Sequence, residues 1–168
     1  STANGCKSAA LSFPAQTSHS GRQYRCVVKN STGSVNSNAA TLTVSSDVAI
    51  NEANFPDSNF RSYVTKFDTD GNGTLSSSEL SVVTGIVADE MGIASLKGVE
   101  FFTNLKSLYC YDNALTSLDL SKNTALEYLD CCWNTLTSLN VSGNTALTRL
   151  YCYGNALTSL DLSKNTAL

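Results

Sequence analysis

Oxygen-bearing side chains occupy every second position from Asp68 to Ser76, and Glu79 follows three residues later. Oxygen atoms are the ligands of a hard cation, which takes six to eight of them. Gly73 permits the sharp turn that wraps a chain around such an ion. The predicted ligands are the side chains of Asp68, Asp70 and Asn72, the backbone carbonyl of Thr74, Ser76 directly or through a water, and Glu79 with both carboxylate oxygens. Three carboxylates around one divalent ion predict calcium binding.

The spacing of these residues fits the EF-hand loop, D-x-[DN]-x-[DN]-G-x5-E, at every defined position. A single loop without a partner loop is expected to bind calcium weakly, with a Kd near ~10⁻⁴ M. The alternative is a loop that has kept this shape and lost its metal. Ser76 and Glu79 also have the spacing of a capping box, which predicts a helix directly after the loop.

A second helix is expected before the loop. Pro56 and Asp57 form a favourable helix start. The apolar residues that follow recur at helical spacing and form one face: Phe60, Tyr63, Val64 and Phe67. Residues 47–82 are therefore predicted to form an EF-hand-like helix–loop–helix that caps whatever follows.

Aromatic residues gather between residues 109 and 153, where five of the seven tyrosines and the single tryptophan lie. Exposed Tyr and Trp bury a large area at low entropy cost and are enriched in binding hot spots. The predicted ligand-binding face consists of Tyr109, Tyr111, Tyr128, Asp130, Trp133, Arg149, Tyr151 and Tyr153. The alternative is that aromatic residues are there because they favour strands.

Six cysteines offer further chemistry. Cys110, Cys131 and Cys152 recur at one position of a repeat and are predicted to face the interior as small hydrophobic residues, with a disulfide or metal ladder as the alternative. Cys132 is expected to point outward as the most reactive thiol. Whether Cys6 pairs with Cys26 stays open, because sequence alone cannot settle it.

Catalysis finds little support in the chain. His19 is the only histidine, and there is no nucleophile elbow, Cys–His arrangement or phosphate-cradling glycine motif. We therefore expect a protein that is not an enzyme.

A 21-residue repeat must position these groups. Leu105, Leu126, Leu147 and Leu168 are in register, and residues 109–126 recur as residues 151–168 with a single change, Asp112 to Gly154. Exact periodicity of this kind predicts a solenoid in which each repeat is one coil.

Each repeat consists of two similar halves, one containing L-x-x-L-x-C-x-x-N and the other L-x-x-L-x-L-x-x-N. Alternation with period 2 predicts a short strand in each half, on both sides of the coil, stacked in parallel at about 4.8 Å per coil. The recurring Asn, such as Asn113, is predicted to point inward and bond backbone groups at the bend.

The unit resembles the short bacterial leucine-rich repeats of the form LxxLxCxxNxLxxLDLxxN. The stretch from Ile50 to Val64, with Asn-Phe-Pro-Asp inside it, resembles the helix that precedes such repeats in secreted proteins of Gram-positive gut and clostridial bacteria. This resemblance implies a leucine-rich-repeat solenoid over residues 83–168 and an extracellular location. Degenerate repeat positions are expected at Val83, Ile86, Ile93 and Leu96, and Phe101 and Phe102 are expected to close the end of the solenoid.

Residues 1–46 are predicted to be β-structure, with strand-like runs at Ala9–Ala15, Arg22–Asn30 and Asn38–Ser45. Tyr24 precedes Cys26 by two residues, which is the spacing of a tyrosine corner. The segment resembles the C-terminal strands of an immunoglobulin-like domain, although the other conserved cysteine and the core tryptophan are absent. The alternative is a generic hairpin.

A net charge of −3 offers no basic surface for nucleic acid, and no apolar stretch is long enough to span a membrane. Because the chain starts and stops in mid-pattern, we expect a piece of a longer protein, truncated at the C-terminal end of the solenoid. The sequence thus predicts a mainly β, calcium-stabilised extracellular module for protein–protein recognition or adhesion. Carbohydrate binding is the alternative, as is a non-catalytic appendage of a secreted hydrolase.

Overall fold

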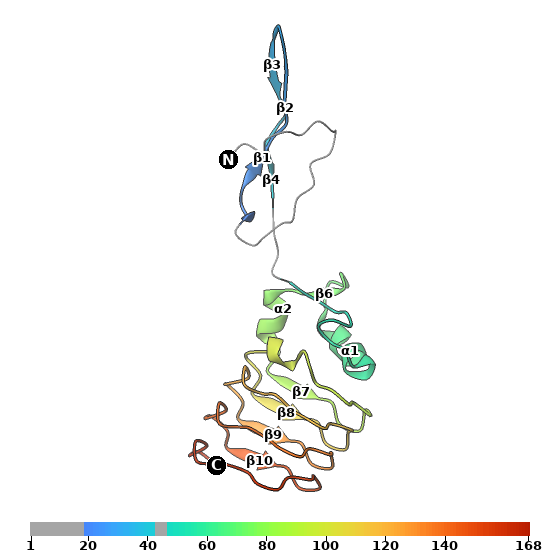
Figure 1. Ribbon diagram of the computed structural model, residues 1–168, viewed down its shortest axis with the longest axis vertical. Coiled ribbons are helices and arrows are strands. Elements are labelled where there is room, and N and C mark those ends of the chain that lie inside the picture. The colour runs from blue at the N-terminus through green and yellow to red at the C-terminus, as the bar shows by residue number, and fades with distance from the viewer. Residues whose placement is uncertain (1–18, 43–46) are drawn as a thin grey trace. The chain divides into compact units, whose positions relative to one another are not determined.

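The computed structural model describes residues 19–42 and 47–168, and the chain divides into two compact units, Ser1–Ser46 and Asp47–Leu168. Figure 1 shows the strands and helices of both units.

Short antiparallel strands make up the described part of the first unit. Strand β1 (Gln23–Tyr24) pairs with β4 (Ala40–Thr41), and β2 (Val27–Asn30) pairs with β3 (Gly33–Asn36). The β2–β3 turn forms because the Asn30 side chain accepts hydrogen bonds from the backbone N–H groups of Thr32 and Gly33.

The strand prediction for this unit needs revision. The predicted run Arg22–Asn30 is broken into β1 and β2, and β3 is an additional strand. The predicted run Ala9–Ala15 and Cys6 lie outside the described residues, as does any pairing of Cys6 with Cys26. The immunoglobulin-like interpretation stays a prediction.

A four-stranded parallel sheet organises the second unit, in the order β10-β9-β8-β7. Its strands are β7 (Gly85–Val87), β8 (Ser107–Tyr109), β9 (Tyr128–Asp130) and β10 (Arg149–Tyr151), and they stack along successive coils (Figure 1). Ile86, Leu108, Leu129 and Leu150 pair in register across the strands. The 21-residue period is therefore the period of the sheet.

The inward column after these strands contains the predicted cysteine ladder. Cys110 and Cys131 are fully buried, and Cys152 in the last coil is half-buried. None of the three forms a disulfide. Burial raises the pKa of the Cys131 thiol to about 12, so the side chain stays neutral and packs as a small hydrophobic group. The prediction of inward cysteines is confirmed.

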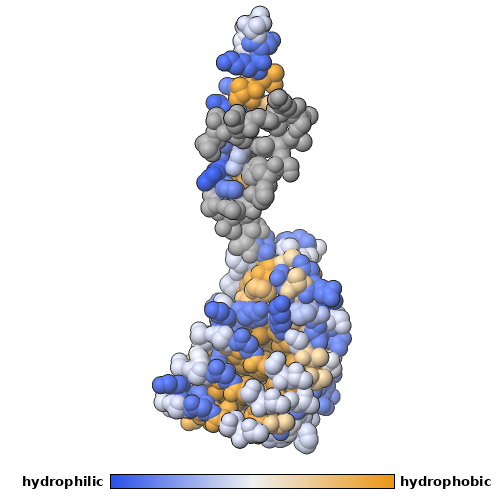
Figure 2. All heavy atoms as spheres, in the orientation of Figure 1, coloured by the Kyte–Doolittle hydropathy of each residue, from blue (hydrophilic) through white to orange (hydrophobic). Residues whose placement is uncertain are grey.

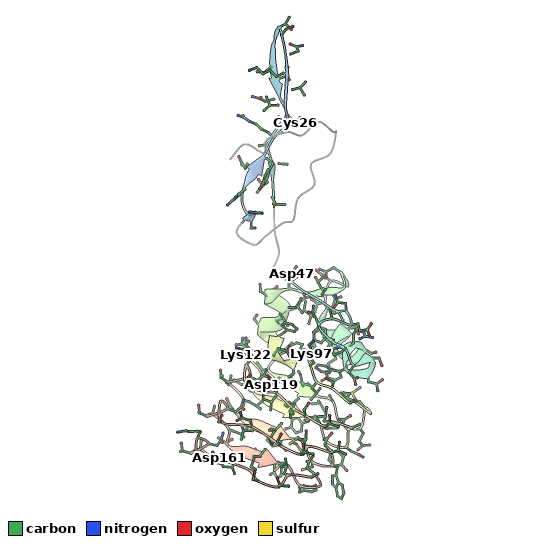
Figure 3. All side chains as sticks on the ribbon, in the orientation of Figure 1. Cys26, Asp47, Lys97, Asp119, Lys122 and Asp161 are labelled. Atoms are coloured by element: carbon green, nitrogen blue, oxygen red, sulfur yellow. The ribbon has the colours of Figure 1, made fainter. Side chains whose placement is uncertain are left out.

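The prediction of strands on both sides of each coil is wrong for the second half of the repeat. There the described residues form one isolated parallel bridge, Asp119 (labelled in Figure 3) with Asn140, and turns. The Asp119 side chain accepts a hydrogen bond from the Ser121 N–H, and Asn140 does the same with Ser142. Such local side-chain bonds compete with the ladder bonds of a strand and turn the chain early.

Two ladders of inward asparagines join the coils, as predicted. Asn134 Nδ2 donates to the carbonyls of Cys110, Cys131 and Cys132, and its Oδ1 accepts from the Leu115 N–H. Asn113 and Asn155 repeat both roles in the neighbouring coils. In the second ladder Asn123, Asn144 and Asn165 repeat only the donor role, each to two backbone carbonyls of neighbouring coils, and their buried Oδ1 atoms accept no hydrogen bond. The ladders supply hydrogen bonds to backbone carbonyls that a turn would otherwise leave buried and unpaired.

Helices cover the β7 end of the stack (Figure 1). Helix α1 (Ser58–Val64) begins at Asp57, whose side chain accepts from the N–H groups of Asn59 and Phe60. The 3-10 turn η2 (Thr65–Phe67) follows, and α2 (Ser77–Val82) begins with the predicted capping box. Strand β6 (Thr74–Leu75) lies between them and pairs antiparallel with β5 (Val48–Ala49).

The helices and the coils share one hydrophobic core. Phe60 and Val64 from α1 are fully buried in the same cluster as Leu108 and Leu129 of the sheet. The degenerate repeat positions Val83, Ile86, Ile93 and Leu96 are all buried, and Phe102 is buried beside the 3-10 turn η3 (Val99–Phe101). In Figure 2, hydrophobic residues (orange) extend across the stacked coils and are interspersed with hydrophilic ones (blue). No helix among the described residues has the length and apolar character needed to cross a membrane.

Candidate functional site

The predicted ligand loop lies between α1 and α2. Each of the carboxylates of Asp68, Asp70 and Glu79 contributes an oxygen to a group in which all atoms lie within 4.8 Å of one another. Calcium–oxygen distances of 2.3–2.6 Å allow two ligands of one ion to be up to about 5 Å apart. The spacing of the three carboxylates is therefore compatible with a shared calcium ion.

Backbone N–H groups hold the first half of this loop around its acidic side chains. The Asp68 carboxylate accepts from the N–H groups of Asn72 (3.1 Å) and Gly73 (2.8 Å), and Asn72 Oδ1 accepts from the Thr74 N–H (2.8 Å). Gly73 has a φ of +80°, a left-handed conformation that a glycine adopts without strain. Thr74 is further fixed because it belongs to β6, which pairs with β5.

Glu79 is the most tightly held of the predicted ligands. Its Oε2 accepts from the N–H and hydroxyl of Ser76, and its Oε1 accepts from the N–H and hydroxyl of Thr69. These bonds, led by the one from the Ser76 N–H, lower the pKa of Glu79 to about 2, so the group is ionised at neutral pH. Thr69 was not among the predicted residues, because its position in the loop motif accepts any residue.

The outward face of the parallel sheet brings the predicted aromatic residues together. In register across β7 to β10, one outward column contains Gly85, Ser107, Tyr128 and Arg149, and the next contains Val87, Tyr109, Asp130 and Tyr151. The Tyr109 and Tyr128 rings stack at 4.6 Å, and the Tyr128 and Tyr151 rings lie 5.7 Å apart. Three coils thus contribute to one continuous aromatic row.

Trp133 and Tyr153 extend this row past the ends of the strands. Their rings meet edge to face at 6.0 Å, and the two residues are 54% and 61% exposed. Trp133 has a φ of +52°, which is unusual for a bulky residue. A Cβ at Gly154 would lie 2.9 Å from Trp133 Cδ2, so the Asp112 to Gly154 change in the repeated block makes room for the Trp133 ring.

The expectation of an outward, reactive Cys132 is wrong, since this residue is only 1% exposed. Cys132 occupies the position that Tyr111 occupies in the preceding coil and Tyr153 in the following coil. A small side chain between two large ones in the same column is shielded from solvent. Burial, together with the neighbouring Asp130 carboxylate, raises the pKa of its thiol to about 12, so the reactive thiolate is suppressed.

The stacked parallel strands, the inward asparagine ladders and the 21-residue coil define a leucine-rich-repeat solenoid. The chain is similar to internalin J from Listeria monocytogenes serotype 4b (strain F2365), with 43% identity over 71 residues, which are 42% of this chain and 8% of that protein. The chain therefore spans a small part of that relative. No protein family model matches the chain.

The comparison with solved structures also finds internalins. The functional domain of InlJ from Listeria monocytogenes, which includes a cysteine ladder, has a TM-score of 0.68 and 39% identity, over 76% of this chain and 28% of that one. Listeria monocytogenes internalin C2 has a TM-score of 0.65 at 20% identity over 77% of this chain and 58% of that one, and shares the fold. The chain is thus similar to internalins, and its fold is that of a leucine-rich-repeat solenoid.

Proposed function

We propose that this chain is an extracellular, non-catalytic module that recognises a protein partner through the outward face of strands β7 to β10. The observation that carries this proposal is the aromatic row on that face, in which Tyr151, Trp133 and Tyr153 are exposed. The similarity to the functional domain of InlJ from Listeria monocytogenes, which includes a cysteine ladder, supports it.

The two sides of each coil differ in the way that a one-sided binding surface requires. The sheet face contains Tyr, Trp and a few charged residues, whereas the opposite side contains small exposed polar residues such as Thr116, Ser117 and Ser138. A shallow groove on that opposite side is lined by Ser117, Asp119, Ser138 and Asn140 and contains no aromatic residue. Aromatic side chains contribute more binding energy to protein interfaces than small polar side chains do.

The packing of the rings favours a protein ligand over a sugar. A sugar ring stacks on a free aromatic face, but Tyr109 and Tyr128 already stack on each other. Their edges and hydroxyl groups remain for contacts with another protein, while Tyr151 (44% exposed) and Trp133 offer larger surfaces.

We expect Trp133→Ala and Tyr153→Ala each to weaken binding of a protein partner, the stronger by about 2 kcal/mol or more. The partner would be selected by screening the chain against bacterial and host surface proteins and, in parallel, against glycans. Affinities would be compared by biolayer interferometry. Both side chains are exposed, so circular dichroism spectra of the variants should match the parent.

Thr116→Ala and Ser138→Ala on the opposite side are the matched controls and should leave the affinity nearly unchanged. Equal losses on both sides would contradict the assignment of the face. A screen that selects only glycans would return carbohydrate binding as the function.

Calcium is proposed as the ligand of the loop from Asp68 to Glu79. Support comes from the three carboxylates that fit one ion and from the bonds that already shape the loop. For Glu79 to bind with both oxygens, the hydroxyls of Ser76 and Thr69 must rotate away, which hydroxyl groups can do. Because the loop joins α1 to α2 and Leu75 within it is fully buried, an ion that braces it would stabilise the capped end of the core.

Millimolar calcium should therefore raise the melting temperature of the chain, by an amount equivalent to ~2.7 kcal/mol at a concentration about 100-fold above the Kd. Asp70→Asn and Glu79→Gln should abolish the response to calcium in differential scanning calorimetry. Glu79→Gln also weakens the capping box, so the readout is the shift between calcium and chelator rather than the melting temperature itself.

Glu127→Gln, an exposed carboxylate on the coils, is the control and should keep the full calcium shift. Identical melting curves with calcium and with chelator in the parent chain would contradict the calcium proposal and leave the loop as a structural turn.

A further inference from the structure

Charge is distributed unevenly over the outward face. Where the strands end, successive coils contribute Asp89, Glu90, Asp112 and Asp130. Arg149, at the start of β10, is the only basic residue in the outward columns from Gly85 to Gly154. None of the four carboxylates forms an ion pair within the part of the chain that the structure describes.

The charged residues that directly precede the strands do not neutralise these acids. Lys106 and Glu127 lie beside the start of the strands and pair with each other at 3.0 Å. Their charges cancel locally, so the strand ends keep a net negative charge next to exposed aromatic rings.

Backbone bonds between coils place the acids directly against the aromatic residues. Tyr111 N–H donates to the Asp89 carboxylate (2.8 Å), and Glu90 N–H donates to the Tyr111 carbonyl (2.9 Å). Trp133 N–H donates to the Tyr153 carbonyl (3.0 Å) in the same manner. Burial raises the pKa of Tyr111, and the charges of Asp112, Glu90 and Asp130 raise it further, as expected for a phenol beside carboxylates.

One set of backbone positions presents the acids and the tryptophan at equivalent places. Glu90, Asp112, Trp133 and Gly154 all have left-handed backbone, with φ of 56°, 49°, 52° and 68°, and follow one another along the stack. We name the surface formed by Asp89, Glu90, Tyr111, Asp112, Trp133 and Tyr153 the acidic aromatic patch.

We propose that the acidic aromatic patch binds the cationic side chains of a basic segment, arginine or lysine, in a protein partner. The inference rests on the proposed function and adds the chemistry of the partner. A guanidinium or ammonium group is attracted by the face of an aromatic ring, best by that of Trp, and nearby carboxylates supply its counter-charge. An acidic segment would instead meet the three carboxylates of the patch, which lack ion-pair partners.

The only tryptophan in the chain, Trp133, reports on this patch directly. A short synthetic peptide of alternating glycine and arginine should change its fluorescence in a saturable way. The same peptide with citrulline, which is uncharged and similar in shape, should bind at least about tenfold more weakly. Raising the salt concentration from about 0.05 to about 0.5 M should weaken binding of the arginine peptide, because exposed charges are screened.

The double variant Glu90→Gln with Asp112→Asn should bind the arginine peptide about tenfold more weakly, while Trp133 stays in place as the reporter. Asn tolerates the left-handed backbone of Asp112 well, so the fold is expected to persist. Asp119→Asn, on the other side of the coil, is the matched control, since Asn140 already occupies the equivalent position one coil later. It should leave the peptide affinity unchanged.

Equal affinity for the arginine and citrulline peptides, equal losses in the patch and control variants, or no saturable change would each overturn this inference. The inference can also fail while the proposed function holds. If Trp133→Ala and Tyr153→Ala abolish binding of a protein partner while the arginine peptide does not bind, the face recognises proteins without a cationic anchor.

Discussion

Replacing Cys131 by Asp should unfold the coils, whereas replacing it by Val should leave them folded. Cys131 is fully buried in the ladder, and its thiol donates one long hydrogen bond, 3.5 Å, to the Tyr151 carbonyl. Valine fills nearly the same volume and should cost less than about 1.5 kcal/mol. Aspartate would place a charge in the core without a partner, at a cost of more than about 4 kcal/mol.

Urea unfolding followed by circular dichroism, with reductant present, would measure both effects. Thr137→Asp, an exposed position in the same coil, adds the same charge and should change the free energy of unfolding by about 0.5 kcal/mol or less. If Cys131→Val unfolds the coils as Asp does, the thiol has a covalent or metal-binding role that simple packing does not explain.

Asn134→Leu should be the second most damaging substitution, although leucine has a similar size. The Asn134 side chain donates to three carbonyls and accepts from the Leu115 N–H while being 6% exposed. Leucine would leave buried backbone groups without these partners, at a cost of at least about 3 kcal/mol. The urea midpoint should fall accordingly.

Asn104→Leu provides the comparison, since this exposed side chain makes one hydrogen bond, to the Ser81 carbonyl. Its expected cost is about 1 kcal/mol or less. Similar losses for the two asparagines would show that the ladder contributes little and that leucine packing alone holds the coils together.

The loop from Asp68 to Glu79 shows how far a sequence motif determines the geometry of a candidate site. The spacing from Asp68 to Glu79 sets which side chains converge, because the turn at Gly73 and the capping box at Ser76 are local features. The bonds from Thr69 to Glu79 and the pairing of β5 with β6 depend on residues that the motif leaves undefined. These contacts form only when the helices have packed, so the motif alone does not predict them.

The amino-acid sequence by itself determined the coil, its period and its interior. Alternation of inward and outward residues follows from strand geometry, so Leu108, Cys131 and Asn134 could be assigned to the interior before any coordinates. The repeat also placed the aromatic residues on one face, because residues one period apart must stack.

The tertiary structure decided the features that depend on contacts between different coils. The burial of Cys132 depends on tyrosines one coil before and one coil after it, and the position of the Trp133 ring depends on the missing Cβ of Gly154. The second half of each repeat forms turns rather than strands because Asp119 and its equivalents bond their own backbone. The period and the composition predict which residues become neighbours. Side-chain volumes and competing hydrogen bonds decide which of these side chains are buried and whether a segment forms a strand or a turn.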